Sequence, residues 1–478
     1  MSEPTTAHAF DDELARLDAT ATAAAVRVGE VTALEVVRAA IERARRLDAE
    51  LSAIAEPDYE RALERAAGPL TGAFAGVPTF IKDNVDVEGL PTREGSDAFH
   101  RVGPATRTAE IARQFADMGT VCLGKSSLPE FGFTASTEFP DQRATRNPWN
   151  LGHSAGGSSG GSAALVAAGV VPIAHGNDGG GSIRIPAAAC GLVGLKGTRG
   201  RIVPNDGSKL LPVDIVSDGV LSRSVRDTAT FFAQAETMHR DPRLPAVGHV
   251  TEPLDRPLRI GLVTEPPTDI EVDSPTRAAL YRVAADLEAL GHSVRPVELP
   301  LSARFAEDFT HYWAMLAYSV SRHGHRLYDR SFDHGRLTDL THGLARHFRS
   351  RAHRTPGVVW RMKRSAADHA GLFTDIDVML SPTCATLTPA IGHLGTHLPF
   401  DVLFPRVEQW VGFTPLANAT GAPSISLPLG HDAASNLPIG IMFGAAHGQD
   451  RLLLELALQL EEAHPWPRVD QVPIPAAD

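Results

Sequence analysis

Apolar residues recur at helical spacing within the first seventy residues of the chain. Thr32 and Glu35 form a T-x-x-E pattern, in which two side chains reciprocally satisfy backbone N–H groups at the start of a helix. The apolar positions that follow lie three or four residues apart and form one face: Leu34, Val37, Ile41, Ala44 and Leu47. The pattern predicts an amphipathic helix whose apolar face packs on a larger body.

Beyond residue 70, short apolar runs alternate with helical patterns. Ser274 and Asp450 stand where they could cap two of these helices, and residues 301–370 are helical with no strand. The alternation predicts an α/β layered fold with one large, mostly buried sheet. The predicted strands cover 74–87, 120–124, 170–175, 258–263, 293–299, 377–380, 424–429 and 439–443, and further helices cover 108–118, 160–168, 274–291 and 450–462.

The composition of the chain bears on its binding partners and its cellular location. The 478 residues include 45 basic and 57 acidic side chains, and the net charge of −12 gives no support to nucleic-acid or acidic-membrane binding. Cys122, Cys190 and Cys384 are far apart and form no C-x-x-C pair, so neither a disulfide framework nor a cysteine zinc site is expected. The N-terminus shows no secretion signal, and the longest apolar run, 163–174, is too short to span a bilayer. We expect a cytoplasmic protein.

The stretch GNDGGGSIR, residues 176–184, is the first candidate for chemistry. Three successive glycines, Gly179, Gly180 and Gly181, let their N–H groups converge on one point, and Ser182 follows them directly. A hydroxyl beside free amides is the layout that acyl transfer needs, with a nucleophile next to an oxyanion hole. A glycine-rich turn with a serine helix cap explains the stretch equally well.

Other glycine- and serine-rich patterns are weaker. G-x-S-x-G occurs twice, centred on Ser158 and Ser159, but a polar loop precedes it where an α/β-hydrolase elbow would follow a strand. No lysine follows the glycines, as a phosphate-binding loop would require. His323 and His325 have no acidic or third partner nearby for a metal. We expect no metal and no cofactor.

Several long stretches together resemble the amidase signature family. They are FAGVPTFIKDN at 74–84, GGSSGGSAALVAAG at 156–169 and HGNDGGGSIRIPAAACGLVGLKG at 175–197, with KSSLPEFGF, TRNPWN and FTPLANATGAPSISLPLG elsewhere. The form of the third stretch is most similar to free-standing actinobacterial-type amidases, which include cyclic-amide hydrolases acting on nylon oligomers.

The resemblance implies the fold and the organisation of the chain. A large mixed central β-sheet would be covered by helices on both faces, in a single amidase domain over residues 1–478. Within it, 1–70 would form N-terminal helices, 71–240 the signature core, 301–370 a helical region on the substrate side, and 371–470 a return to the sheet.

The resemblance also implies a Ser–cis-Ser–Lys triad. Ser182 would be the nucleophile, Ser158 the bridging serine after a cis peptide bond from Gly157, and Lys82 the base. The amides of Gly179, Gly180, Gly181 and Ser182 would form the oxyanion hole, with Ser159 as a supporting hydrogen-bond partner. Asn177 and Gly179 stand where many members of the family carry threonines.

A lysine can act as a base only when it is neutral, yet its reference pKa is ~10.4. Burial of Lys82 among Phe80, Ile81 and Val85 would lower this pKa, provided that no carboxylate is close. Asp83 is its neighbour, and we expect its side chain to face away because successive strand residues point to opposite faces. Taken alone, the strand favours the other reading, in which Lys82 merely extends to solvent, as most lysines between apolar residues do.

Five residues are candidates for the substrate pocket. Phe133 and Thr134 match positions that line the acyl pocket in the family, and Trp313, Trp410 and Phe413 are aromatic candidates, although core packing explains each of them too. They would suit an apolar or aromatic acyl group.

The expected activity is hydrolysis of a small-molecule carboxylic amide through an acyl-enzyme, with esters, anilides or carbamates as further substrates and a homodimer as an open option. One alternative is the amidase subunit of a glutamine-dependent tRNA amidotransferase. Those subunits usually read GGSIRQPA, whereas Ile185 stands here in place of the glutamine. The other alternative is an α/β-hydrolase-type esterase.

Overall fold

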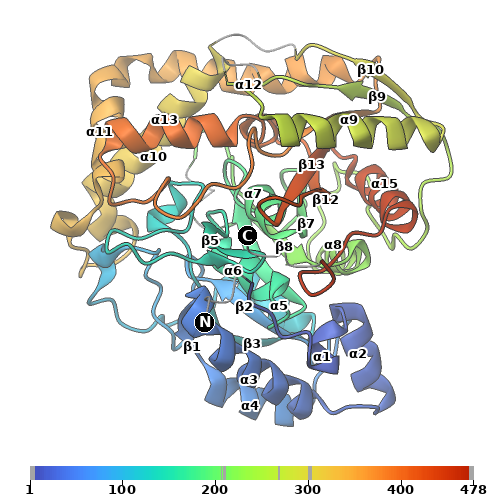
Figure 1. The fold of residues 1–478 in the computed structure, drawn as a ribbon. Coiled ribbons are helices and arrows are strands. Elements are labelled where there is room, and N and C mark those ends of the chain that lie inside the picture. The colour runs from blue at the N-terminus through green and yellow to red at the C-terminus, as the bar shows by residue number, and fades with distance from the viewer. Residues whose placement is uncertain (1–5, 206, 208–210, 267–269, 300–303, 473–478) are drawn as a thin grey trace.

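A computed structural model describes residues 6–205, 207, 211–266, 270–299 and 304–472 of the chain (Figure 1). Its centre is an eight-stranded sheet with the order β10-β9-β11-β13-β12-β7-β8-β6. The pairs β10/β9 and β9/β11 are parallel and the other pairs are antiparallel, so the predicted mixed sheet is confirmed. The strands are β6 (Ile173–Asp178), β7 (Val193–Lys196), β8 (Ser217–Ser222), β9 (Arg259–Leu262), β10 (Ser293–Pro296), β11 (Val378–Pro382), β12 (Ser424–Asp432) and β13 (Leu437–Ala445).

Two smaller sheets accompany the large one. A three-stranded sheet has the order β1-β3-β2, from β1 (Ile54–Pro57), β2 (Pro78–Lys82) and β3 (Val121–Ser126). The expectation of one sheet was therefore incomplete, because the strand that ends at Lys82 belongs to this second sheet. β2 nevertheless lies against β6 of the large sheet. A short hairpin is formed by β4 (Arg146–Asn147) and β5 (Asn150–Ser154).

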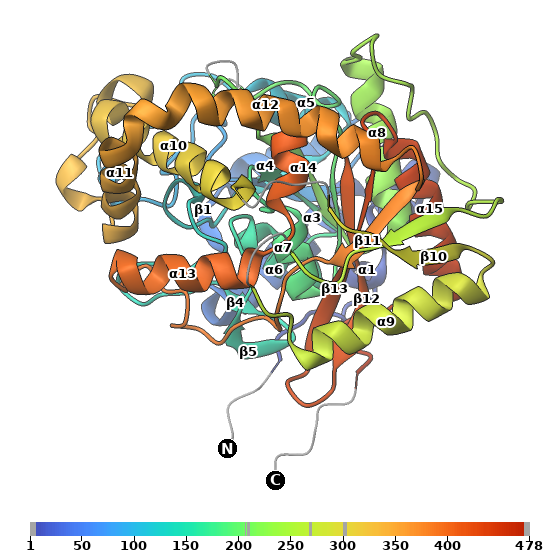
Figure 2. The same cartoon turned by 90° about the horizontal axis from the view of Figure 1, so that it is seen from above.

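Helices cover both faces of the large sheet, as predicted. The short buried helix α7 (Arg184–Cys190) contacts β7, β12 and β13 and packs on α6 (Gly160–Ala167). The helices α8 (Val225–Met238) and α15 (Asp450–Ala463) contact each other and the sheet. The helix α9 (Ser274–Ala289) also contacts the sheet. In Figure 2 the strands run between α6 and α7 on one side and α8 and α15 on the other.

The N-terminal helices lie at one end of the molecule (Figure 1). The capping box is present, with the Glu35 N–H donating to the Thr32 hydroxyl at 3.2 Å and the Thr32 N–H donating to the Glu35 carboxylate at 2.8 Å. The predicted apolar face of α3 is buried at Val37, Ile41 and Leu47. The N-terminal helices are α1 (Glu13–Arg16), α2 (Ala19–Val28), α3 (Ala33–Leu51) and α4 (Tyr59–Ala67), and α5 (Glu110–Asp117) follows β2 in the chain.

The helical region beyond residue 301 sits at the opposite end of the molecule (Figure 1). It comprises α10 (Phe305–Leu327), α11 (Asp339–Arg351) and α12 (Thr355–Leu372), which confirms the absence of strands in the described part of 301–370. The return toward the sheet adds α13 (Phe400–Val411) and α14 (Pro415–Thr420), which the apolar pattern had not indicated. Short 3-10 helices cover Asp97–Phe99, Glu130–Gly132, His334–Arg336 and Ala352–Arg354.

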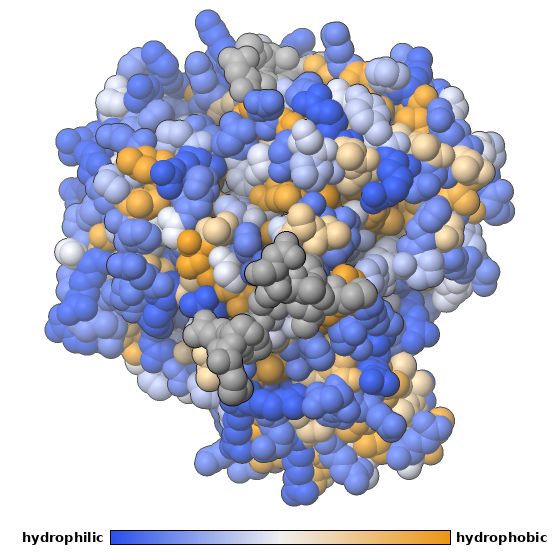
Figure 3. Space-filling view, in the orientation of Figure 1, coloured by the Kyte–Doolittle hydropathy of each residue, from blue (hydrophilic) through white to orange (hydrophobic). Residues whose placement is uncertain are grey.

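The surface in Figure 3 is mostly hydrophilic, with apolar residues in small separate groups. In the described part of the chain, every helix is too short or too polar to cross a membrane.

Two predicted helix caps are wrong. Asp273, not Ser274, caps α9 by accepting from the Thr276 N–H. Asp450 lies in the first turn of α15 without capping it; its fully buried carboxylate instead accepts from the Thr198 N–H at 2.7 Å and from Arg201 at 2.8 Å. It ties α15 to the loop that follows β7.

We expect Asp450→Ala to lower the free energy of unfolding by about 3 kcal/mol, because it leaves the buried Thr198 amide without its partner and removes one of the two carboxylates that bind the buried Arg201 guanidinium. Denaturant unfolding of the two proteins measures the difference. Glu42→Ala is the control, since it breaks an exposed ion pair with Arg45 and should leave the unfolding free energy nearly unchanged. Equal effects of the two substitutions would contradict the importance of the buried pair.

Candidate functional site

The turn between β6 and α7 carries Ser182 and is held from inside by one carboxylate. Asp178, the last residue of β6, accepts hydrogen bonds from the N–H groups of Gly181 at 2.7 Å and Ile183 at 3.2 Å. Its side chain is fully buried, so the backbone of the turn wraps around it. The conformation of the segment before Ser182 therefore depends on Asp178.

Arg184 completes this anchor. Its guanidinium binds both oxygens of Asp178 at 2.9 Å and also donates to the Asn418 side chain at 2.7 Å. Burial alone would raise the pKa of Asp178, but the charge and hydrogen bonds of Arg184 and the Asn418 amide outweigh it and hold the pKa well below the usual range. The sequence analysis did not identify this trio; an arginine two residues after the candidate serine was the available signal.

Lys82 is the meeting point of three distant segments. Its Nζ lies 2.8 Å from the Ser158 hydroxyl, 3.0 Å from the Ser159 hydroxyl and 2.7 Å from Oδ1 of Asn177. The lysine is fully buried, and none of these three partners is charged. The structure thus brings together Lys82, Ser158 and Ser159 from the predicted set, and adds Asn177.

Burial lowers the pKa of Lys82 to about 7, although the more distant carboxylates of Asp218, Glu94 and Asp178 oppose the shift. Asp83 does not contact Lys82. Its carboxylate binds Lys125 at 2.9 Å and so faces away from Lys82, as expected, although Asp83 lies in the turn just after β2 and not in the strand.

A buried histidine supports Lys82 from behind. The Lys82 backbone N–H donates to Nδ1 of His175 at 3.2 Å, so Nε2 of the neutral ring carries the proton and donates to Asp218 at 3.0 Å. His175 and Asp218 are almost fully buried on the paired strands β6 and β8. They fix the backbone at Lys82 and place one negative charge in its surroundings.

Ser182 faces a cavity. In the part of the chain that the structure describes, its hydroxyl makes no hydrogen bond, while its carbonyl accepts from the Ser159 N–H at 3.3 Å. The peptide bond between Gly157 and Ser158 is cis. The hydrogen bond from the Ser159 N–H to the Ser182 carbonyl joins the two serine-bearing segments directly.

The amides of the glycine turn differ in their availability. The Gly181 N–H is engaged by Asp178, whereas the N–H groups of Gly179, Gly180 and Ser182 have no hydrogen-bond partner among the described residues. Three of the four predicted amides thus remain free to bind a ligand.

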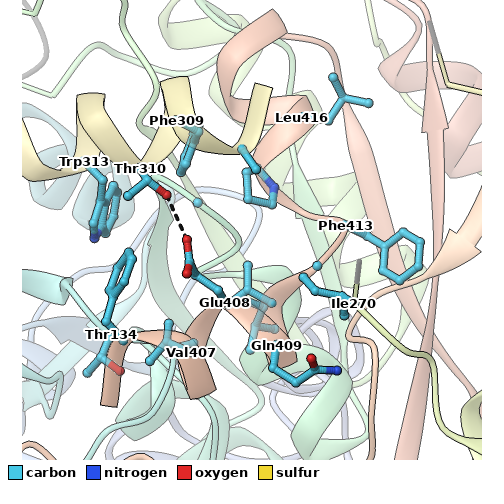
Figure 4. Close-up of a pocket in the computed structure, with 18 of the residues that line it drawn as sticks. Thr134, Ile270, Phe309, Thr310, Trp313, Val407, Glu408, Gln409, Phe413 and Leu416 are labelled. Carbon is cyan, nitrogen blue, oxygen red and sulfur yellow. Dashed lines mark hydrogen bonds between the residues drawn. The ribbon is translucent and has the colours of Figure 1, made fainter. Parts of the chain in front are cut away.

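The cavity beside Ser182 has a volume of about 370 Å³. Of the predicted pocket residues, Phe133, Thr134, Trp313 and Phe413 line it (Figure 4). Trp410 does not: its indole N–H donates to the Thr386 carbonyl and its ring is buried in the core between helices. The missed lining residues come mainly from α10 and α13 and include Phe305, Phe309, Thr310, Phe404, Val407 and Glu408. The spacing of Phe305, Phe309 and Trp313 along one helix was the signal for part of this wall.

Trp313 is fixed in the wall by its neighbours. Its indole N–H donates to the Phe133 carbonyl at 3.2 Å, and its ring stacks on Phe309 with centroids 6.1 Å apart. The Thr134 hydroxyl is buried without a hydrogen-bond partner in the described structure.

The remaining candidates for site chemistry are possible metal ligands and the three cysteines. The described residues contain no group of three or more histidine, cysteine or acidic side chains that could hold a metal ion. Cys122, Cys190 and Cys384 are free thiols, and burial raises the pKa of Cys190 and of Cys384 above the ordinary value.

Comparisons with known proteins identify relatives over almost the whole chain. The Amidase family model matches residues 35–454. The chain is 48% identical over 467 residues to the Mycobacterium tuberculosis protein named "Putative amidase AmiC", covering 97% of this chain and 98% of that protein. It is 34% identical over 484 residues to 6-aminohexanoate-cyclic-dimer hydrolase of Paenarthrobacter ureafaciens, covering 94% and 95%. A solved structure of 6-aminohexanoate cyclic dimer hydrolase superposes with a TM-score of 0.86 at 32% identity, covering 96% of this chain and 99% of that one.

Gly181→Ala should destabilise the protein by about 1–3 kcal/mol, because Gly181 has φ +129° and an added Cβ would lie 2.3 Å from Thr414 Oγ1 and 2.6 Å from Ile185 Cδ1. Thermal and denaturant unfolding measure the loss. Gly179→Ala is the matched control, since its added Cβ would come no closer than 3.5 Å to Trp313 and Val216. Equal stability of the two variants would contradict a turn packed tightly at Gly181.

Proposed function

The chain belongs to the amidase signature family and is a hydrolase of carbon–nitrogen bonds; from this premise we propose that it cleaves a carboxylic amide through an acyl-enzyme on Ser182. The observation that carries the assignment is the contact of Lys82 Nζ with the Ser158 hydroxyl at 2.8 Å, in a fully buried setting with uncharged partners. A lysine in such a setting is neutral in a large fraction of molecules near neutral pH. It can then accept a proton.

In the proposed first step, neutral Lys82 takes the proton of the Ser158 hydroxyl, and Ser158 takes the proton of Ser182 while the Ser182 oxygen attacks the amide carbon. The bridging role of Ser158 is supported by its bond to Lys82 and by the Ser159 N–H that binds the Ser182 carbonyl. Serine needs such a base because its hydroxyl is a poor nucleophile.

The attack converts the carbonyl oxygen into an oxyanion, which needs preorganised donors. The unpartnered N–H groups of Gly179, Gly180 and Ser182 are our candidates for the oxyanion hole. Gly181 was expected to join them, but its N–H is already bound to Asp178. We assign it the role of shaping the turn.

Collapse of the tetrahedral intermediate breaks the C–N bond, and Ser158 passes its proton to the leaving nitrogen. Water then attacks the acyl-enzyme by the same proton route, which releases the carboxylic acid and restores Ser182. Each proton moves between groups of this chain and the substrate, and the net reaction consumes one water.

The cavity favours an apolar or aromatic acyl group, because Phe133, Phe309 and Trp313 dominate the wall next to Ser182. The similarity to a cyclic-dimer hydrolase makes cyclic amides a sensible test alongside anilides, esters and carbamates. Ile185 also lines the cavity, so the position at which the amidotransferase subunits usually carry glutamine presents an apolar side chain here. An α/β-hydrolase mechanism does not fit, since Ser158 and Ser159 both contact a lysine.

A fluorophosphonate probe tests the nucleophile. We expect labelling of the native protein and its complete loss in Ser182→Ala, because only Ser182 would attack the phosphorus. Ser159→Ala is the control and should retain part of the labelling, since it removes one hydroxyl from Lys82 and leaves the nucleophile. Labelling that survives in Ser182→Ala would overturn the assignment.

The activity should rise with pH through the region near pH 7, where Lys82 loses its proton, and reach a plateau on the alkaline side. In Asp218→Asn the rise should move to lower pH: the Asp218 carboxylate favours the protonated lysine, so its removal lowers the pKa of Lys82 further. The amide can still accept from His175, which keeps the geometry.

The pH dependence of kcat/KM on one anilide measures this shift. Asp377→Asn is the control, because it removes a carboxylate bound to Arg259 at the remote end of the sheet and should leave the profile in place. A shift to higher pH in Asp218→Asn would contradict the assignment of Lys82 as the base.

A further inference from the structure

The wall of the Ser182 cavity holds one charge that the proposed chemistry does not use. Among the described residues that line the cavity, Glu408 of α13 is the only one with an ionisable side chain. Most of the other lining residues are apolar or aromatic. A carboxylate in such a wall can accept hydrogen bonds from the protein or from a ligand.

The protein supplies one hydrogen-bond donor to the Glu408 carboxylate. The Thr310 hydroxyl on α10 donates to Oε1 of Glu408 at 3.0 Å, and Figure 4 shows the carboxylate turned toward Thr310. Within the described part of the chain, Glu408 forms no ion pair and its second oxygen accepts no hydrogen bond. The side chain is thus oriented while one oxygen stays available.

The surroundings of Glu408 favour a cation. Partial burial raises the pKa of this carboxyl and the Thr310 hydroxyl opposes the rise only in part, so a positive ligand would stabilise the ionised form. Glu408 stays open to solvent at the junction with a second cavity of about 1120 Å³. The shared wall consists of Ala306, Thr310, Phe404, Pro405 and Glu408.

Basic side chains also line the second cavity, among them Arg351, Arg354 and Arg361, but none of these three forms an ion pair with Glu408 in the described part of the chain. The Arg361 guanidinium is bound to Asp308 at 2.6 Å. The second cavity offers room for water around a cation bound at Glu408. An ammonium group could therefore bind there while it keeps part of its hydration shell.

We propose that Glu408 binds a cationic group of the substrate, and that the preferred substrates are amides bearing a protonated amine separated from the scissile carbonyl by an apolar spacer. The spacer would lie along the aromatic wall formed by Phe309 and Trp313. This inference rests on the proposed function, because it assumes that Ser182, which lines the same cavity, is where the amide reacts.

Two matched series of amides test the proposal. The first has ω-aminoacyl p-nitroanilides of increasing chain length beside acyl anilides of equal length without the amine. The second has the amine on the leaving group, as N-(ω-aminoalkyl) amides beside N-alkyl amides. For at least one length we expect the aminated member to have roughly five-fold higher kcat/KM, the size of a partly solvated ion pair.

Glu408→Gln should abolish this preference through KM more than through kcat, since it removes the charge and keeps the shape. Glu307→Gln is the matched control: Glu307 lines only the second cavity, and the preference should persist in that variant. Higher ionic strength should reduce the preference in the native protein, which a merely structural role of Glu408 would not explain.

Several outcomes would overturn the proposal. They are the absence of a preference at every chain length in both series, a preference that persists in Glu408→Gln, or an equal preference for ω-hydroxyacyl anilides, which would make Glu408 a receptor for neutral donors. Calorimetric measurement of the binding of both series to Ser182→Ala tests cation binding at Glu408 separately from the proposed hydrolysis at Ser182. Selective binding of the aminated members without any turnover by the native protein would support the Glu408 site and reject the proposed hydrolysis.

Discussion

The buried ion pair of Asp178 and Arg184 is the constraint on which the site depends. It satisfies the backbone amides of a turn that would otherwise be unpaired in the core, and it links that turn to Asn418, far along the chain. Breaking a buried pair of this kind leaves an uncompensated charge, which is far more costly than losing an exposed one. The turn is therefore rigid, although it consists largely of glycine.

The site imposes opposite ionisation preferences on two buried side chains, Asp178 of β6 and Lys82 of β2. Asp178 is kept ionised by Arg184, while Lys82 is held close to its neutral form by burial and by uncharged partners. The same burial would raise the pKa of Asp178, so the difference lies in the partners and not in exposure. A carboxylate in contact with Lys82 would favour the charged lysine and oppose its proposed role as a base, and Lys125 keeps the nearby Asp83 carboxylate engaged elsewhere.

The sequence predicted those features that depend on local pattern. The strand–helix alternation indicated the large mixed sheet, and Asp83 does face away from Lys82 as expected, although it lies in the turn after β2. The sequence could not show that β2 belongs to a separate sheet, because strand order depends on pairings between distant segments. Asp450 was mistaken for a cap for a similar reason: its partners, Thr198 and Arg201, lie about 250 residues earlier and give no local signal.

The cavity wall also shows what the sequence alone could not predict. Phe133 and Thr134 follow a recognisable segment, whereas Trp410 and Glu408 stand two residues apart on α13 and only Glu408 lines the cavity. Two positions on a helix point about 200° apart, so a helical pattern shows that they differ but not which one faces the ligand. In the proposed function, the chemistry lies at Lys82, Ser158 and Ser182, whereas much of the cavity wall comes from α10 and α13. On that proposal, changes in these two helices can alter the substrate while the three proposed catalytic residues keep their positions.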